Sequence, residues 1–424
     1  MVTFASSRLE AWHAEGGRAR PAIVGAGFIG RGLAYHLART PGMQPPLIVN
    51  RTVARAHRVL VDAGYAPSSI VISDAPEVLG QALAEGRPAV TSDVSLVTEL
   101  DVDVLVEATG AMGYGVEAML TALRAGIHVV SLNAEVDALL GHLLHAEAAA
   151  GGAVYTIADG DQPGVLLRML DEVRGFGLRP VGTVNCKRNL DVHQDPERSR
   201  AYAARDNTSV AMTTAFGDGT KMHIENVVVA NVTGLLPRPL GTDGVRTTVA
   251  EIADDVATLG WDPGWVHYTL GGDFAGGVVV LAASDQPELD APYLRYGKLG
   301  GGPLYPFFRP YHLIHLEVPA TILQVVAERR PLGEPTSLPV ADCVAIAKRD
   351  LMAGQTLEGI GGGACYGVAA PTSETGDLLP VGLAEHATLV RPVARDAPIR
   401  RHDVELDDTA ELVRLRQRQD RQTP

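Results

Sequence analysis

The chain has 424 residues, of which 46% are hydrophobic, and its formal net charge at pH 7 is −14. A chain of this length can bury a sizeable core and should form two or three domains. The acidic excess argues against nucleic-acid binding, which needs clustered Lys and Arg side chains opposite the phosphates. No apolar run approaches the roughly 20 residues of a membrane-spanning helix, and the N-terminal segment has no apolar signal-peptide core. We therefore expect a cytoplasmic protein that binds neither nucleic acid nor a membrane.

The three cysteines, Cys186, Cys343 and Cys365, are widely spaced and form no CxxC pair. This spacing indicates neither a disulfide framework nor a thiolate zinc site. A reducing compartment fits this use of cysteine.

Strand-like and helix-like segments alternate over the first 155 residues. An apolar strand leads into "GAGFIG" and a helix, and the buried strands "DVDVLVEATG" and "GIHVVSLN" flank the helical segment "GVEAMLTALRAG". The alternation predicts an α/β fold with a Rossmann-type, doubly wound parallel sheet over residues 1–155.

The glycines of "GAGFIG" match the G-x-G-x-x-G pattern of dinucleotide-binding turns in the expected strand–turn–helix context. Gly25 would permit the tight turn, Gly27 would let the backbone approach the pyrophosphate, and Gly30 would let helix and strand pack closely. The alternative is a tight turn with no ligand. Other cofactor contacts are expected at the start of this helix and at the carboxyl edge of the sheet, namely Phe28, Ile29, Ala108, Thr109, Gly110 and Asn133.

The segment "LIVNRTVARAH" contains Asn50 where such domains usually carry an acid that binds the adenosine ribose. A carboxylate at this position would repel a 2′-phosphate, and Asn50 removes that repulsion. Arg51 and Arg55 could bond the phosphate, so we expect NADP(H) rather than NAD(H). The alternative is that both arginines are exposed charges at a helix start.

After residue 155 the pattern changes to longer strand-like runs, among them "SVAMTTAF", "HIENVVVANVTG" and "GGVVVLAA". They predict a mixed α/β domain for catalysis and dimerisation over residues 156–335, whose late helices could pack back on the first domain. A Pro-rich linker then leads to a small β lobe over residues 336–412, and residues 413–424 are expected to be a disordered tail.

Lysines at two places in this second domain are candidates for proton transfer to a carbonyl oxygen. Lys187 ends the strand-like run before "RNLD", and Lys221 follows an expected hairpin turn of Asp218 and Gly219. Each lysine could instead be an ordinary surface residue.

The basic side chains of the second domain suit a small anionic substrate, bound through a phosphate or a carboxylate, and they are Lys187, Lys221, Lys298 and Arg309. Asp159 and Asp161 could instead cap the following helix, and His312 and His315, expected on one helix, are not predicted to bind a metal. The expected substrate contacts are Asp159, Asp161, Gln162, Asn185, Lys298, Arg309 and His312.

Four long strings carry a family resemblance: "GDQPGV", "FGDGTKMHIENVVVANVTG", "KLGGGPLYPFFRPYHLIHLEVP" and "AKRDLMAGQTLEGIGG". They resemble homoserine dehydrogenase-like NAD(P)-dependent oxidoreductases with a C-terminal SAF domain, and in particular the 1-deoxy-D-xylulose 5-phosphate reductoisomerase-like enzymes of some bacteria. The resemblance implies an NADPH-dependent step, a central catalytic and dimerisation domain, and a SAF domain over residues 336–412.

The resemblance leaves the substrate open. A reductoisomerase would rearrange a ketose phosphate and then reduce the aldehyde, whereas a homoserine dehydrogenase interconverts a semialdehyde and its alcohol. The "NGT" strand-turn of homoserine dehydrogenases proper is not recognisable in this sequence. A cofactor-binding sensor without turnover is the alternative outside enzymes, because fold alone does not establish activity.

Overall fold

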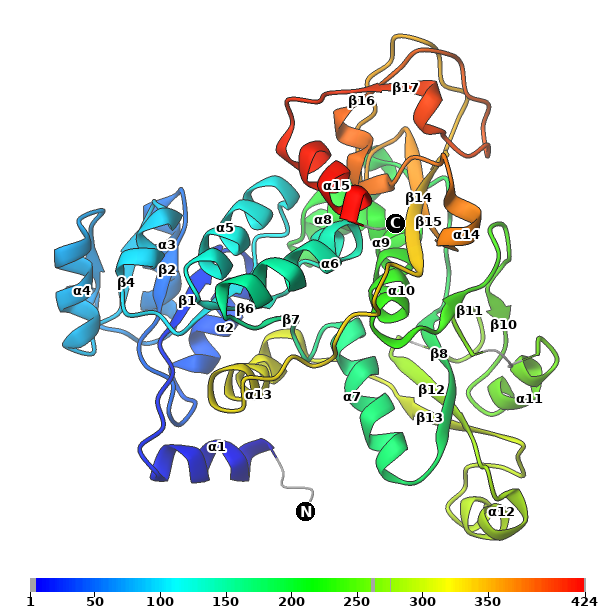
Figure 1. Cartoon of the computed structure of the whole chain (residues 1–424), viewed down its shortest axis with the longest axis horizontal. Helices are drawn as coiled ribbons and strands as arrows, with labels where there is room; N and C mark the ends of the chain where they lie inside the picture. The colour runs from blue at the N-terminus through cyan, green and yellow to red at the C-terminus, as the bar shows by residue number, and fades with distance from the viewer. Residues whose placement is uncertain (1–4, 261–263, 275, 423–424) are drawn as a thin grey trace. The chain divides into compact units, whose positions relative to one another are not determined.

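The computed structural model describes residues 5–260, 264–274 and 276–422, and the chain divides into two units. The first unit contains Met1–Asp137, Gly141–Gly164 and Leu313–Glu334. The second contains Ala138–Leu140, Val165–His312 and Pro335–Pro424. Each unit has its own sheet (Figure 1).

The first unit is built on a seven-stranded parallel sheet in the order β3-β4-β2-β1-β5-β6-β7. Its strands are rich in Val, Ile and Leu and mostly buried, as expected for a parallel sheet that helices cover on both faces. The predicted Rossmann-type sheet is therefore confirmed. The strands are β1 (Pro21–Val24), β2 (Leu47–Val49), β3 (Val71–Ile72), β4 (Ala89–Thr91), β5 (Val104–Glu107), β6 (His128–Ser131) and β7 (Tyr155–Ile157).

Helices pack on both faces of this sheet. Ile23 and Val106 belong to one core cluster with residues of α2, α3 and α13, whereas their chain neighbours point to the other face, where α5 packs against β5 and β6. The helices are α1 (Ala5–Ala14), α2 (Phe28–Leu37), α3 (Val53–Asp62), α4 (Pro76–Ala84), α5 (Met112–Arg124), α6 (Ala134–Gly151) and α13 (Ile314–Ala327), with the 3₁₀ turns η1 (Pro67–Ser69) and η2 (Val94–Glu99).

The second unit contains a mixed sheet in the order β10-β11-β8-β12-β13, with β9 paired to β11. Strands β9, β10 and β11 run parallel to β8 or to each other, while β12 is antiparallel to both β8 and β13. The strands are β8 (Arg179–Lys187), β9 (Leu236–Pro237), β10 (Val245–Arg246), β11 (Trp265–Leu270), β12 (Val278–Ala283) and β13 (Leu304–Arg309). The helices are α7 (Gln162–Gly175), which belongs to this unit from Val165, and α8 (Pro196–Asp206), α9 (Val210–Gly217), α10 (Thr220–Thr233), α11 (Ile252–Ala257) and α12 (Pro287–Tyr296).

Two segments that the sequence pattern predicts as strands are helices. "SVAMTTAF" forms most of α9, capped by the Ser209 hydroxyl, which accepts a hydrogen bond from the Met212 N–H. "HIENVVVANVTG" lies in α10, which is buried on most of its surface. A helix that is buried on most sides shows no clear 3.6-residue period of apolar residues, so the β-branched run in α10 resembles a buried strand. The predicted hairpin turn at Asp218 and Gly219 is accordingly wrong, because these residues join two helices.

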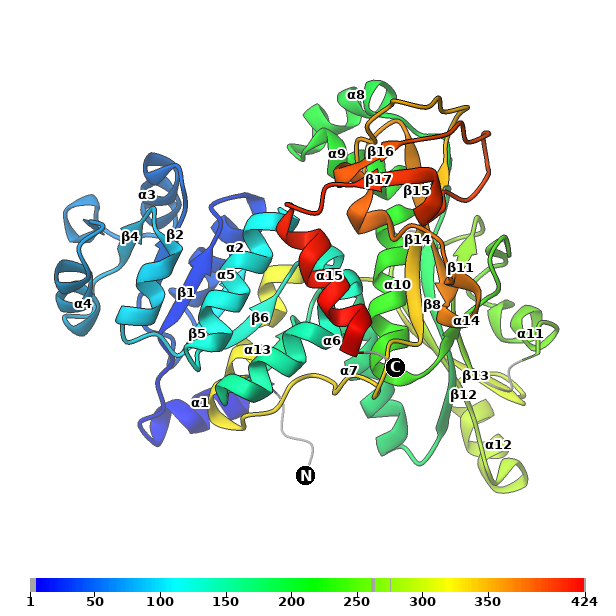
Figure 2. The same ribbon diagram turned by 45° about the horizontal axis from the view of Figure 1, so that its top comes forward.

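The C-terminal lobe is β-rich and packs against α10, which lies beside β14 and β15 (Figure 2). It contains two antiparallel pairs, β14 (Ala341–Ala347) with β15 (Cys365–Pro371), and β16 (Ala387–Leu389) with β17 (Val404–Leu406). The short helical elements are α14 (Thr372–Thr375), η3 (Val381–His386) and η4 (Arg401–Asp403).

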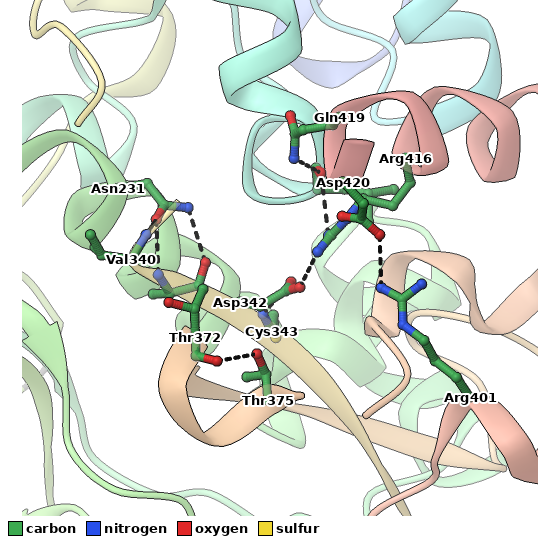
Figure 3. A network of polar contacts seen from close by, with 12 residues as sticks. Asn231, Val340, Asp342, Cys343, Thr372, Thr375, Arg401, Arg416, Gln419 and Asp420 are labelled. Carbon is green, nitrogen blue, oxygen red and sulfur yellow. Dashed lines mark hydrogen bonds and ion pairs between the residues drawn. The ribbon is translucent and has the colours of Figure 1, made fainter. Parts of the chain in front are cut away.

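The predicted disordered tail is wrong for its described part, because Glu411–Gln422 form the helix α15. Leu412, Val413 and Leu415 are buried, which anchors the helix despite its many charged residues. Arg416 is also buried and pairs with Asp342 of β14 and with Asp420, as Figure 3 shows. Among the residues that the structure describes, no helix is long and apolar enough to cross a membrane.

Candidate functional site

The glycine loop between β1 and α2 has the geometry of a phosphate cradle. Gly25 has a φ of +110°, and a Cβ atom there would lie 2.9 Å from the carbonyl oxygen of Ala108. A Cβ atom on Gly30 would overlap the carbonyl oxygen of Gly25, whereas one on Gly27 would meet nothing within 4 Å. The loop therefore needs glycine for its own packing at two positions and leaves open space at the third. The first N–H groups of α2, from Phe28 and Ile29, have no intrahelical acceptors and can face an anion.

Asn50 at the end of β2 holds this loop in place. Its Oδ1 atom accepts a hydrogen bond from the Ala26 N–H at 3.2 Å, and its Nδ2 atom donates to the Thr52 carbonyl at 3.0 Å. Arg51 and Arg55 are exposed, and neither guanidinium group makes a hydrogen bond or an ion pair with any residue that the structure describes. Their guanidinium groups are thus available to a ligand.

The residues after β5 and β6 form a connected polar group at the carboxyl edge of the sheet. Thr109 donates its N–H to Oε1 of Glu107 at 2.8 Å, and its hydroxyl donates to the same oxygen. Gly110, with a φ of +68°, follows at the exposed end of this turn. Asn133 caps α6, because its Oδ1 atom accepts a hydrogen bond from the Val136 N–H at 3.3 Å.

Glu107 is a residue of this edge that the sequence analysis did not single out. It is fully buried, and burial raises its pKa to about 7. The available signal was its position, since an acidic residue that ends a buried parallel strand is unusual for a core position.

Asp159 and Asp161 lie between β7 and α7, and Gln162 follows them at the start of α7. Asp159 is buried, its N–H donates to Thr321 Oγ1 at 3.0 Å, and its Oδ1 atom accepts the Gly160 N–H at 3.0 Å. Asp161 is half-buried, and Gln162 is the buried first residue of α7.

His312 and His315 do not share a helix as expected. The helix α13 begins at Ile314, so His315 is helical and the half-buried His312 precedes the helix. No group of three or more metal-binding His, Cys, Asp or Glu side chains is found within residues 5–260, 264–274 and 276–422.

Asn185 and Lys187 lie on the central strand β8 of the second unit. The Asn185 Nδ2 atom donates to Glu225 Oε2 on α10 at 3.0 Å. Because side chains alternate along a strand, Lys187 points to the same face of the sheet. Its Nζ atom is 5.8 Å from the Phe216 ring centroid, and its side chain is half-buried.

Lys221 lies in the first turn of α10 and is only 5% exposed. It is four residues before Glu225, so both side chains share one face of the helix. Since Glu225 contacts Asn185, this face looks toward β8. The structure therefore brings Lys221, Asn185 and Lys187 to the side of the sheet that α10 covers.

Arg309 belongs to the same row of the sheet as Asn185. In the strand register, Arg309 pairs with Val278 and Val278 pairs with Asn185, so the two side chains lie on one face, two strands apart. The Arg309 guanidinium stacks 4.9 Å from the Tyr311 ring centroid. Lys298, in contrast, is exposed after α12, and its side chain makes no hydrogen bond or ion pair within the described part of the chain.

The turn before α10 is held by the C-terminal lobe, which the sequence did not indicate. Lys348 is buried, and its Nζ atom lies 2.7 Å from Asp218 Oδ2 and 2.7 Å from each of the carbonyl oxygens of Gln194 and Gly362. These acceptors occupy all three ammonium hydrogens. Lys348 therefore holds the start of α10.

The models of two protein families each match a part of this chain. Residues 25–157 match "Homoserine dehydrogenase, NAD binding domain", and residues 160–318 match "Oxidoreductase DRL, catalytic domain". The protein is an NAD(P)-dependent oxidoreductase. Its glycine cradle fits a nicotinamide dinucleotide, and the matched catalytic segment contains Lys187, Lys221 and the Asn185 row.

The solved structures that align with this chain have low sequence identity to it. A probable dehydrogenase from Thermotoga maritima is 12% identical over 74% of this chain and 90% of its own, with a TM-score of 0.43. A myo-inositol dehydrogenase from Corynebacterium glutamicum is 11% identical over 75% of this chain and 90% of its own, with a TM-score of 0.41. A DOX-P reductoisomerase is 13% identical over 50% of this chain and 57% of its own, with a TM-score of 0.35. No curated protein sequence matches the chain.

Proposed function

We propose that the protein uses NADP(H) to oxidise or reduce a small hydroxy or keto compound that carries a phosphate or a carboxylate. The observation that carries this proposal is the end of β2, where Asn50 replaces the expected acid and the guanidinium groups of Arg51 and Arg55 are exposed, with no hydrogen bond or ion pair to a described residue. A carboxylate there would repel a 2′-phosphate, whereas Arg51 and Arg55 can form charge-assisted hydrogen bonds with it.

The second unit supports an anionic substrate. Lys187 and Arg309 reach the same face of the mixed sheet as Asn185, and cationic side chains on one face attract a phosphate or a carboxylate. We also propose substrate contacts at Lys298, Asp159, Asp161, Gln162 and His312.

The bound nicotinamide would exchange a hydride with the substrate carbon. Lysines of this chain would transfer a proton to or from the substrate oxygen, because a carbonyl that gains a hydride must also gain a proton. Lys221 is shielded from bulk water by burial, and Lys187 lies on the same face with a half-buried side chain. We assign proton transfer to this pair and orientation of the anionic group to Arg309 and Asn185.

The finer proposal is a reductoisomerase of a ketose phosphate, with a semialdehyde dehydrogenase of the homoserine type as the alternative. Both use the same cofactor and proton donor, but only the reductoisomerase changes the carbon skeleton. We further propose that the C-terminal lobe is of the SAF type and that the protein is a homodimer or a higher homo-oligomer, since symmetric dimers are the commonest closed assembly of soluble chains.

The test is an assay of NADPH and NADH oxidation with ketose phosphates, sugar acids and amino-acid semialdehydes, with products identified by mass and by NMR. We expect turnover with NADPH and an anionic substrate. A rearranged skeleton identifies the reductoisomerase, and an unchanged one identifies the dehydrogenase. Tight NADPH binding without turnover across the panel would contradict the proposed substrate class, and a preference for NADH would contradict the cofactor assignment.

A further inference from the structure

Glu107 lies at the edge of the sheet where the nicotinamide half of a dinucleotide binds. The sheet order places β2 on one side of β1 and β5 on the other. The adenosine half is expected over β2 and the pyrophosphate at α2, so the nicotinamide half extends over β5 and β6. Glu107 is the last residue of β5 and is 0% exposed.

The Glu107 carboxyl is only partly satisfied by the protein. Its Oε1 atom accepts hydrogen bonds from the N–H and the hydroxyl of Thr109. Its Oε2 atom is buried and has no hydrogen-bond partner among the described residues. A buried polar atom without a partner is costly, so such an atom at a ligand-binding edge is a candidate for interaction with the ligand.

Tight packing fixes the position of this carboxyl. A Cβ atom on Gly115 of α5 would lie 3.2 Å from the Glu107 carboxyl carbon and 2.9 Å from Asn133 Nδ2. The carboxyl is thus held between the loop after β5, the helix α5 and the cap of α6.

The charged groups around Glu107 bring it close to half-protonation at neutral pH. Burial and the neighbouring Glu135 of α6 raise its pKa to about 7, while the hydrogen bonds from Thr109 and the nearby amide of Asn133 oppose this shift. Tyr114 of α5 and Tyr155 of β7 also interact with its charge, and Tyr155 donates a hydrogen bond to Asp137 at 2.7 Å. None of these groups that act on Glu107 is a cation.

We propose that the buried carboxyl of Glu107 determines how strongly the protein prefers the oxidised over the reduced nicotinamide cofactor. The oxidised ring carries a positive charge and the reduced ring is neutral. An ionised Glu107 attracts the oxidised ring through a medium of low dielectric constant, whereas a protonated Glu107 does not. The inference needs only a bound nicotinamide and holds for NADP(H) and for NAD(H).

The first test is the ratio of the dissociation constants of NADP⁺ and NADPH, measured by titration calorimetry from about pH 5.5 to about pH 8.5, on both sides of the Glu107 transition. As the pH rises through this range, NADP⁺ should gain roughly 3- to 10-fold in affinity relative to NADPH. The 2′-phosphate also titrates near pH 6, but it is present in both forms and cancels in the ratio. NAD⁺ and NADH, which lack this phosphate, should give the same trend.

Glu107→Gln is the decisive variant, because the amide is similar in size and neutral at every pH. It should abolish the pH dependence and keep the ratio at the low-pH value of the wild type. Glu117→Gln, which removes an exposed charge from the neighbouring helix α5, is the matched control and should keep the wild-type profile. A flat ratio in the wild type, or a wild-type profile in Glu107→Gln, would overturn the proposal.

Proton release provides a measurement that needs no variant. By linkage, a ligand that favours ionised Glu107 must release protons from it on binding. Calorimetry at pH 7 in two buffers of different ionisation enthalpy should show net proton release for NAD⁺ that NADH does not show. Equal release for both forms contradicts the inference, while failure of the substrate assays alone would leave it intact.

Discussion

Arg51 and Arg55 both follow β2, but they occupy different positions. Arg51 comes directly after Asn50, whereas Arg55 lies in the first turn of α3. We expect Arg51→Asp to reduce the preference for NADP(H) over NAD(H) by about 10-fold or more, because it replaces an attraction with a repulsion at the phosphate. Arg55→Asp should reduce it by less.

The ratio of kcat/KM for the two cofactors measures this preference. Arg58→Asp, also exposed on α3, is the control with the same charge change. Equal effects of all three substitutions would show that the total positive charge of this surface, rather than a direct contact of Arg51 with the 2′-phosphate, determines the cofactor preference.

The two proposed proton-transfer lysines make a second prediction at the residue scale. Lys221→Ala and Lys187→Ala should each lower kcat by about 100-fold or more, the usual contribution of a general acid. Cofactor affinity, measured by fluorescence titration, should change little. Arg188→Ala removes an exposed charge next to Lys187 and should retain activity. If neither lysine variant slows turnover, the catalytic assignment is wrong.

The helix α15 is held by an ion-pair network that the sequence did not suggest. Arg416 is buried between Asp342 of β14 and Asp420, and Asp420 also pairs with Arg401 at 3.1 Å (Figure 3). Arg416→Met should destabilise the protein by about 3 kcal/mol, because it leaves the Asp342 carboxylate buried without its partner.

Urea unfolding, followed by fluorescence and by circular dichroism, measures this loss. Arg414→Met removes an exposed charge from the same helix and should change the unfolding free energy by less than about 0.5 kcal/mol. Equal stability of the two variants would show that the buried network contributes nothing.

Helices and strands of the first unit were predictable because their apolar residues recur with a clear spacing and because turn residues separate them. The glycine turn, β5, α5 and β6 follow directly from "GAGFIG" and from short apolar runs separated by a helical segment. In α10, the run Val227–Val229 is buried on all sides and carries no period that separates helix from strand. In α15, three apolar residues anchor a helix whose composition is that of a tail.

The candidate site was predictable only in part, for a related reason. The sequence motif predicts the glycine cradle. The position of Arg309 in the same row as Asn185, on either side of β12, depends on strand register, which a local sequence pattern does not reveal. Lys348 and Asp218 are 130 positions apart in the sequence, and only the packing of the C-terminal lobe on α10 brings them together.

At the scale of the whole molecule, buried titratable groups predict how stability depends on pH. Burial lowers the pKa of His145 and His267 to about 4 and that of His223 to about 3. These histidines bind protons more readily when unfolded, so stability is present above pH 6.5 and is lost as the pH falls toward 4. Glu107 and Asp137, with pKa values of about 7 and 6, act in the opposite direction, because the folded state holds their protons. Because three histidines outweigh two carboxyls, we expect the melting temperature to rise from about pH 4 to about pH 7 and to change little just above pH 7.

Glu107→Gln tests how much the Glu107 carboxyl alone contributes to the pH dependence of stability. The variant should be more stable than the wild type at pH 8, by about 2 kcal/mol, because it avoids a buried charge, and the two should be similar at pH 5. Melting curves at both pH values measure this difference. A difference that does not depend on pH would contradict a raised pKa at this position.

The helix α13 completes the first unit from far along the chain. Val318, Ile322 and Val325 are buried in the same core cluster as Ile23 and Val106, yet Val165–His312 lie between these two parts of the unit and belong to the second. During synthesis, we expect the strands of the Rossmann sheet to leave the ribosome before α13. Until α13 follows, part of the apolar surface of the sheet has nothing to cover it. A fragment that ends at Gly164 should therefore expose this apolar surface and aggregate, so the cofactor-binding unit is best studied within the full chain.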